Sequence, residues 1–312
     1  MRHWRPTVRT ILRQGYITAR QWVRGAIINN PTLDRWVGYP LRRLERHVNL
    51  RWVLSLDRGG VLECHGFKIA YRPEDAGVVT MIKLYGDYEP ETRELLDDLL
   101  QPGMTFVDGG AHIGYFSLLA GRKVGPEGRV YAFEPVPETR ELLEKNVRAN
   151  GLQDVVDSHG YAVSEEPGSI TFVINAESSV SSKMLANDGA NGRLVEIPTI
   201  SLDAFFEQQG WPRCDVVKLD IEGAELPAFR GMKQLAARNP ALKLIFEFHV
   251  GNLERTDTPA KDLFDALADL GFDRYHVLHR TLTEIQIPEG IDELVALAKR
   301  GNVNVVAQRR SP

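Results

Sequence analysis

Cysteine is scarce in this chain of 312 residues, which contains only Cys64 and Cys214. Two cysteines so far apart in sequence provide neither a disulfide framework nor the CxxC pair of a zinc or redox site. No run approaches the roughly 20 apolar residues of a membrane span, and the first residues lack the apolar core and cleavage site of a secretion signal. We therefore expect a folded protein of the reducing cytoplasm.

Acidic residues are nearly missing from the first part of the chain. Residues 1–51 hold 11 arginines against Asp34 and Glu45, whereas residues 52–312 hold 27 basic and 40 acidic side chains. On a helix, the segment 4–12 would place an apolar face beside a stripe of arginines. Two interpretations of residues 1–33 stay open: peripheral contact with the inner face of an anionic membrane, or packing on the acidic body. Scattered arginines without a known RNA-binding module argue against a nucleic-acid partner.

From residue 104 onward, strand and helix patterns alternate. The expected strands cover residues 104–108, 129–134, 215–220, 242–248, 275–278 and 303–307. This alternation is typical of an α/β fold, with a parallel sheet covered by helices on both faces. About sixty residues between 156 and 215 break the pattern and predict an inserted β excursion.

The patterns divide the chain into three regions: a basic helical extension (1–50), a small β/α cap region (51–101) and a cofactor-binding domain (102–312). In the second region, two β-rich runs predict a hairpin that turns at 57–60, and Pro90 begins a helix. In the third region we expect a single helix from about 225 to 239, and another over 259–270 with Thr258 as its N-cap.

The most informative motif is the glycine-rich loop VDGGAHIG at residues 107–114, between a strand and a helix. Such a loop lets the backbone approach a ligand, and Glu134, 20 residues after Gly114, can accept hydrogen bonds from the hydroxyls of an adenosine ribose. A dinucleotide motif needs a glycine where Ala111 stands, and Asp108 would repel a pyrophosphate. These details favour S-adenosylmethionine over NAD. An NAD-dependent oxidoreductase and a non-catalytic cofactor-binding module remain as alternatives.

Three segments in combination, VDGGAHIGYFS, YAFEPVPE and KLDIEGAE, resemble the FkbM family of S-adenosylmethionine-dependent methyltransferases, which have a class I Rossmann-like fold. The resemblance runs from about residue 85 to 307 and includes the segments 86–90, 162–164, 200–203 and 302–304. The family more often has Asn where this chain has His112. The resemblance implies that the cofactor is bound by the loop residues, by an acid at its ribose and by a segment near its adenine: Asp108, Gly109, Gly110, Ala111, His112, Gly114, Glu134, Ala162 and Val163.

The resemblance also implies methylation of a hydroxyl on a glycan, a glycolipid or a secondary metabolite. Ligands of open α/β sheets bind at the carboxyl ends of the strands, so a general base is expected among Asp220, Glu222, Glu247 and His249. Histidine titrates nearest neutral pH, and Asp220 has the best position by family analogy. Structural roles are the alternatives for Glu222, Glu247 and His249. The spacing of these residues matches no metal motif, so we predict no metal.

Overall fold

The computed structural model describes residues 59–174, 183–184, 193–279, 281–299 and 303–309. The predicted basic helical extension, including the segment 1–33, lies outside the described residues. Within the described part, no helix is both long and apolar enough to cross a membrane.

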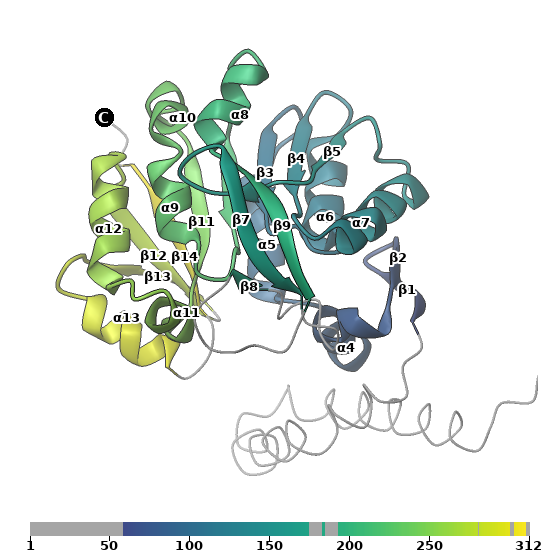
Figure 1. Ribbon diagram of the computed structural model, residues 1–312, viewed down its shortest axis with the longest axis horizontal. Helices are drawn as coiled ribbons and strands as arrows, with labels where there is room; N and C mark the ends of the chain where they lie inside the picture. The colour runs from purple at the N-terminus through teal and green to yellow at the C-terminus, as the bar shows by residue number, and fades with distance from the viewer. Residues whose placement is uncertain (1–58, 175–182, 185–192, 280, 300–302, 310–312) are drawn as a thin grey trace, which may run out of the picture.

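A central sheet of eight strands forms the body of the molecule (Figure 1). In spatial order its strands are β13 (Thr281–Ile285), β12 (Arg274–His279), β14 (Val303–Gln308), β11 (Lys243–Phe248), β10 (Val216–Leu219), β3 (Thr105–Gly109), β4 (Arg129–Phe133) and β5 (Val156–His159). The strands from β11 to β5 are parallel, which confirms the predicted α/β fold. At one side of the sheet, β14, β12 and β13 pair antiparallel, a change of direction that the sequence pattern did not predict.

Side chains that alternate along these strands enter two separate cores. In β11, Phe246 and Phe248 face one core and Ile245 faces the other, and all three are fully buried. The first core is covered by α8 (Leu202–Gln208), α9 (Glu225–Arg230), α10 (Lys233–Arg238), α11 (Val250–Arg255), α12 (Ala260–Asp269) and α13 (Ile291–Ala298). The second is covered by α4 (Ala76–Tyr85), α5 (Pro90–Leu99), α6 (Tyr115–Val124) and α7 (Pro137–Ala149). Helices thus cover both faces, as predicted.

The predicted β excursion forms a second, smaller sheet. It consists of β6 (Ala162–Val163), β9 (Arg193–Ile200), β7 (Gly168–Ile174) and β8 (Lys183–Met184), in that order. Figure 1 shows β7 and β9 as a long antiparallel pair in front of the central sheet. This sheet forms one wall of the pocket described below.

Three local predictions were wrong. The second β-rich run is not one strand but is itself a hairpin, β1 (Gly60–Cys64) and β2 (Phe67–Tyr71), which turns at His65 and Gly66, both with positive φ. The first β-rich run and residues 57–58 of the predicted turn lie outside the described residues. The helix expected over 225–239 is two helices, α9 and α10, separated at Gly231, which lies against the carbonyl oxygen of Ser164 with no room for a Cβ. The N-cap of α12 is Pro259, while the Thr258 hydroxyl contacts Thr256.

The hairpin is attached to the main domain by an asparagine ladder from α7. Asn146, which is fully buried, accepts the N–H of Ala70 (2.7 Å) and donates to the carbonyls of Ala70 (3.0 Å) and Ile113 (2.8 Å). One helical turn later, Asn150 makes the same pair of bonds to the backbone of Lys68 in a more exposed position. The two side chains bond to the backbone of β2 in the way that a neighbouring strand would.

We expect Asn146→Ala to lower the free energy of unfolding by about 3 kcal/mol, because buried backbone groups then lose their partners. Asn150→Ala is the matched control and should cost about 1 kcal/mol or less, since water can replace its bonds. Urea unfolding of both variants measures the difference. Equal losses would show that burial of this ladder contributes nothing.

Candidate active site

A pocket of about 1290 Å³, including its open mouth, lies at the carboxyl ends of β3, β4, β10 and β11. This is the edge at which open α/β sheets bind ligands. Its lining comes from the glycine loop, the end of β4, the second sheet, the end of β10 and the segment before α5. The lining residues include Tyr88, Gly110, Ala111, His112, Phe116, Glu134, Tyr161, Ala162, Val163, Phe172, Lys218, Asp220, Glu222 and Glu247.

The glycine loop is clamped between two strand ends. The N–H groups of Gly110 and Ala111 both donate to the carbonyl of Phe133, at 3.0 and 2.9 Å. Gly110 has φ +80°, and a Cβ there would lie 1.9 Å from the carbonyl oxygen of Asp220. Glycine is therefore required at 110 by contact with the protein itself, rather than by a ligand.

The predicted loop residues separate into two groups. Gly110, Ala111 and His112 line the pocket. Asp108, Gly109 and Gly114 lie behind the loop and are not part of the lining. Gly114 packs on α7, since a Cβ there would lie 2.5 Å from a methyl group of Leu143.

Asp108 faces the second core and not the pocket. Its side chain is 1% exposed, and one carboxylate oxygen accepts the Ser117 hydroxyl at 2.6 Å. Burial raises the pKa of Asp108, and the charge of Lys218 partly opposes this shift. A direct contact of Asp108 with the cofactor, as the resemblance implied, has no support from this position.

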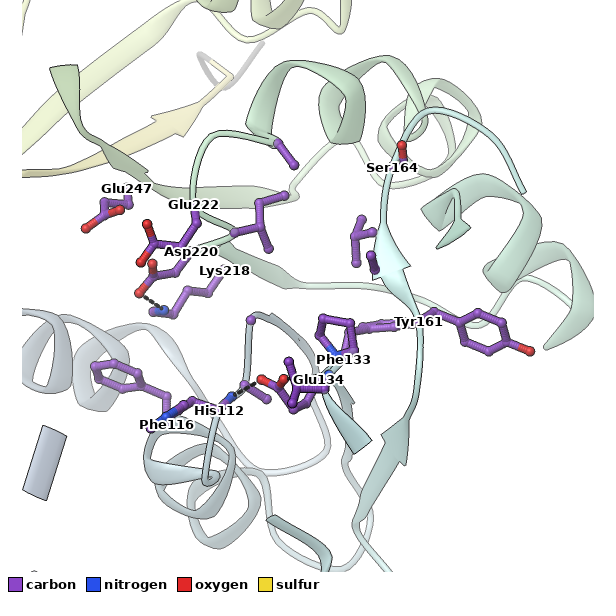
Figure 2. Close-up of a pocket in the computed structure, with 18 of the residues that line it drawn as sticks. His112, Phe116, Phe133, Glu134, Tyr161, Ser164, Lys218, Asp220, Glu222 and Glu247 are labelled. Carbon is purple, nitrogen blue, oxygen red and sulfur yellow. Dashed lines mark hydrogen bonds and ion pairs between the residues drawn. The ribbon is translucent and has the colours of Figure 1, made fainter. Parts of the chain in front are cut away.

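Glu134 is held at the pocket wall by two backbone groups. Its two carboxylate oxygens accept the N–H of His112 and the N–H of Val136, each at 2.9 Å (Figure 2). Each oxygen keeps acceptor capacity for a ligand hydroxyl. Burial raises the pKa of Glu134 to about 7, although the two N–H groups stabilise the charged form. The remaining acceptor positions of the Glu134 carboxylate fit the hydroxyls of the ribose of the predicted cofactor.

The second sheet provides the wall beside Glu134. Ala162 and Val163, predicted near the adenine, line the pocket together with Tyr161 and Phe172. An apolar wall of this kind suits a flat base. The segment that broke the strand and helix alternation therefore builds part of the pocket wall.

Three of the four predicted catalytic residues meet at the opposite end of the pocket. Asp220, Glu222 and Glu247 line it (Figure 2). The Asp220 carboxylate accepts a hydrogen bond from the Lys218 ammonium at 3.1 Å. Burial, together with the charges of Asp220 and Glu222, raises the pKa of Glu247 to about 9. At neutral pH, Glu247 is therefore a protonated acid that can donate a hydrogen bond.

The structure does not bring His249 to the pocket. Its Nδ1 accepts the N–H of Asn252 at 3.1 Å, so the ring caps the N-terminus of α11. His249 is absent from the lining residues, whereas Glu247, two residues earlier, is among them. The structural alternative considered for His249 is the one this geometry supports.

The sequence-based site missed Tyr88, Glu89 and Lys218. Tyr88 and Lys218 line the pocket, and Lys218 is 2% exposed. Glu89 accepts hydrogen bonds from Thr92 (3.0 Å) and from Asn304 (3.1 Å), which is the register partner of Glu247. A lysine inside the apolar strand DVVKLD was the available signal. The segments 86–90 and 302–304 belonged to the resemblance, but no role had been given to them.

The described residues contain no group of three or more His, Cys, Asp or Glu side chains that could hold a metal ion. The pocket instead has two different ends. At one end, Glu134 is held by backbone N–H groups beside an apolar wall, and at the other end several acids lie near Lys218. Such an arrangement can bind a nucleoside at one end and place a reacting hydroxyl at the other.

Comparison with known proteins identifies the family to which the chain belongs. The family model described as the methyltransferase FkbM domain matches residues 108–274, slightly more than half of the chain. The chain is 28% identical over 245 residues to the AMB antimetabolite synthetase AmbE of Pseudomonas aeruginosa, covering 68% of this chain but 11% of that protein. It is 27% identical over 192 residues to the hexuronic acid methyltransferase AglP of Haloferax volcanii, covering 61% of this chain and 74% of AglP.

Among solved structures, an S-adenosylmethionine-dependent O-methyltransferase from Thermotoga maritima matches with a TM-score of 0.42 and 14% identity. The match covers 85% of each chain. At these values the likeness carries no inference about activity.

We expect Gly110→Ala to lower the melting temperature by several degrees and to abolish ligand binding in the pocket, because the new Cβ must push the loop away from Asp220. Gly103→Ala is the matched control: its φ is +82°, but a Cβ there would meet nothing within 4 Å. Thermal unfolding of the two variants separates the clash from the backbone strain that they share. A similar small shift for both would refute the close contact.

Proposed function

We propose that this chain, which belongs to the FkbM methyltransferase family, uses S-adenosylmethionine to methylate a hydroxyl group of a glycan, a glycolipid or a related metabolite. The observation that carries the proposal is the two-ended pocket. Glu134 at one end suits a ribose, and Asp220 and Glu247 at the other suit a hydroxyl acceptor.

In the half of the pocket around Glu134, which we call the cofactor half, each residue would contact a different part of S-adenosylmethionine. Glu134 would accept hydrogen bonds from the ribose hydroxyls, and Ala162 and Val163 would contact the adenine. The backbone of Gly110 and Ala111 would lie beside the methionine part. When bound, the cofactor supplies an electrophilic methyl group.

The residues of the distal half supply the acid and base functions. Asp220 accepts the proton of the attacking hydroxyl, and its hydrogen bond to Lys218 keeps the carboxylate oriented. Glu247, protonated at neutral pH, donates a hydrogen bond to another oxygen of the acceptor. Alignment of the hydroxyl with the methyl group provides much of the rate.

Two observations support a sugar or a similar polyol as acceptor. The distal half offers several carboxyl groups, which suit vicinal hydroxyls. AglP, to which the chain is similar, is a hexuronic acid methyltransferase. The identity of the methylated hydroxyl is the part of the proposal to be decided by assay.

Binding of S-adenosylmethionine should weaken about tenfold between pH 8 and pH 6, because the carboxylate form of Glu134 accepts the ribose hydroxyls and is lost as pH falls through about 7. Glu134→Gln should bind more weakly and remove this pH dependence. Glu225→Gln is the matched control: the pKa of Glu225 is also raised to about 7 by burial, but the residue lies outside the pocket lining. Calorimetry at both pH values is the measurement, and an unchanged slope in Glu134→Gln would exclude the ribose assignment.

Transfer of labelled methyl groups should be tested on a panel of glucuronic acid, methyl glucoside and nucleotide sugars. With the acceptor that is methylated, Asp220→Asn should reduce kcat about 10²-fold or more, because a general base acts in the transition state. Its affinity for S-adenosylmethionine should change by less than about tenfold. Asp269→Asn, an exposed acid remote from the pocket, should retain full activity. Near-normal turnover by Asp220→Asn would remove it as the base.

A further inference from the structure

Lys218 is a fully buried lysine in the middle of the molecule, an unusual environment for this residue type. It lies on β10, and its Nζ is 3.1 Å from Asp220 Oδ2 and 4.8 Å from the centre of the Phe116 ring. Burial lowers the pKa of Lys218, but the carboxylates of Asp220, Asp108 and Glu89 raise it above its ordinary value. The ammonium therefore stays charged.

Two carboxylates flank this ammonium from neighbouring positions of the sheet. Asp108 on β3 is the register partner of Lys218, so their side chains emerge on the same face. One oxygen of Asp108 accepts the Ser117 hydroxyl, and the other has no hydrogen-bond partner among the described residues. Asp220 follows two residues after Lys218 and reaches the pocket wall. The Lys218 ammonium thus interacts with two acids: Asp108, behind the glycine loop, and Asp220, in the pocket.

We propose that Lys218 is a positioning residue of the distal half of the pocket: its ammonium holds Asp220 against the wall and sets how strongly the pocket prefers the sulfonium cofactor to its uncharged thioether product. The inference rests on the proposed function, since it concerns the same ligand. It assigns a task to a residue that touches neither reacting atom in the proposed mechanism.

Charge distinguishes the two ligands. S-adenosylmethionine carries a sulfonium charge that S-adenosylhomocysteine lacks, and the two ligands are otherwise nearly identical. Loss of the ammonium leaves Asp108 and Asp220 less neutralised, which favours the cationic ligand. Loss of the Asp220 charge makes the surroundings of the ligand less negative, which disfavours the cationic ligand. A substitution that only disturbs the structure of the pocket would weaken the binding of both ligands by a similar factor.

The experiment measures the dissociation constants of S-adenosylmethionine and S-adenosylhomocysteine by calorimetry at pH 8. Lys218→Met keeps the apolar stem and removes the charge. We expect it to raise the ratio of the product constant to the cofactor constant about five- to tenfold, and Asp220→Asn to lower the ratio by a similar factor. Lys233→Met, on the exposed surface of α10, should leave the ratio unchanged.

Melting temperatures of the variants confirm that each is folded. If Lys218→Met does not fold, the opposite shift in Asp220→Asn still tests the inference. Unchanged ratios in both variants, or parallel losses for the two ligands, would overturn it. A wild-type protein that binds neither ligand would instead overturn the proposed function and the inference with it.

Discussion

The site depends on the contact between the backbone of Gly110 and the carbonyl oxygen of Asp220. The parallel pair β3 and β10 delivers both residues to the same sheet edge, and the loops that follow the strands meet with no room for a Cβ at 110. This contact brings the cofactor loop and the proposed base within one pocket. Two N–H bonds to Phe133 then attach the loop to β4, at whose end Glu134 stands.

The alternation of side chains along the strands explains how buried charges are tolerated beside an apolar sheet. Phe106, Val216 and Ile245 face the second core, and the residues two positions further on are Asp108, Lys218 and Glu247. The apolar interior therefore changes to a polar row at the carboxyl edge, where Lys218 offsets part of the acidic charge. Burial at this edge raises the pKa of both Glu247 and Glu134. The protonation of the acid at each end of the pocket is therefore set by how deeply its side chain is buried.

Periodicity and turn residues predicted most elements of the described region, including β3, β4, β10 and β11 and the helices α5, α6 and α7. These elements have regular patterns and clear ends. The antiparallel strands β12 and β14 were found, but their direction was not, because strand direction depends on how the chain returns to the sheet. The break at Gly231 was not predicted, and the carbonyl of Ser164 that packs against this glycine lies more than sixty residues away in sequence.

The sequence by itself determined the glycine loop, Glu134 and the acids after β10 and within β11, because each belongs to a short motif at a strand end. Only the tertiary structure decided which of these residues share a pocket. It turned His249 into a helix cap, placed Asp108 behind the loop, and brought Lys218 to Asp220 and Asn304 to Glu89. Such pairings depend on distances of a few ångströms between strands, and residue types along a chain do not encode those distances locally.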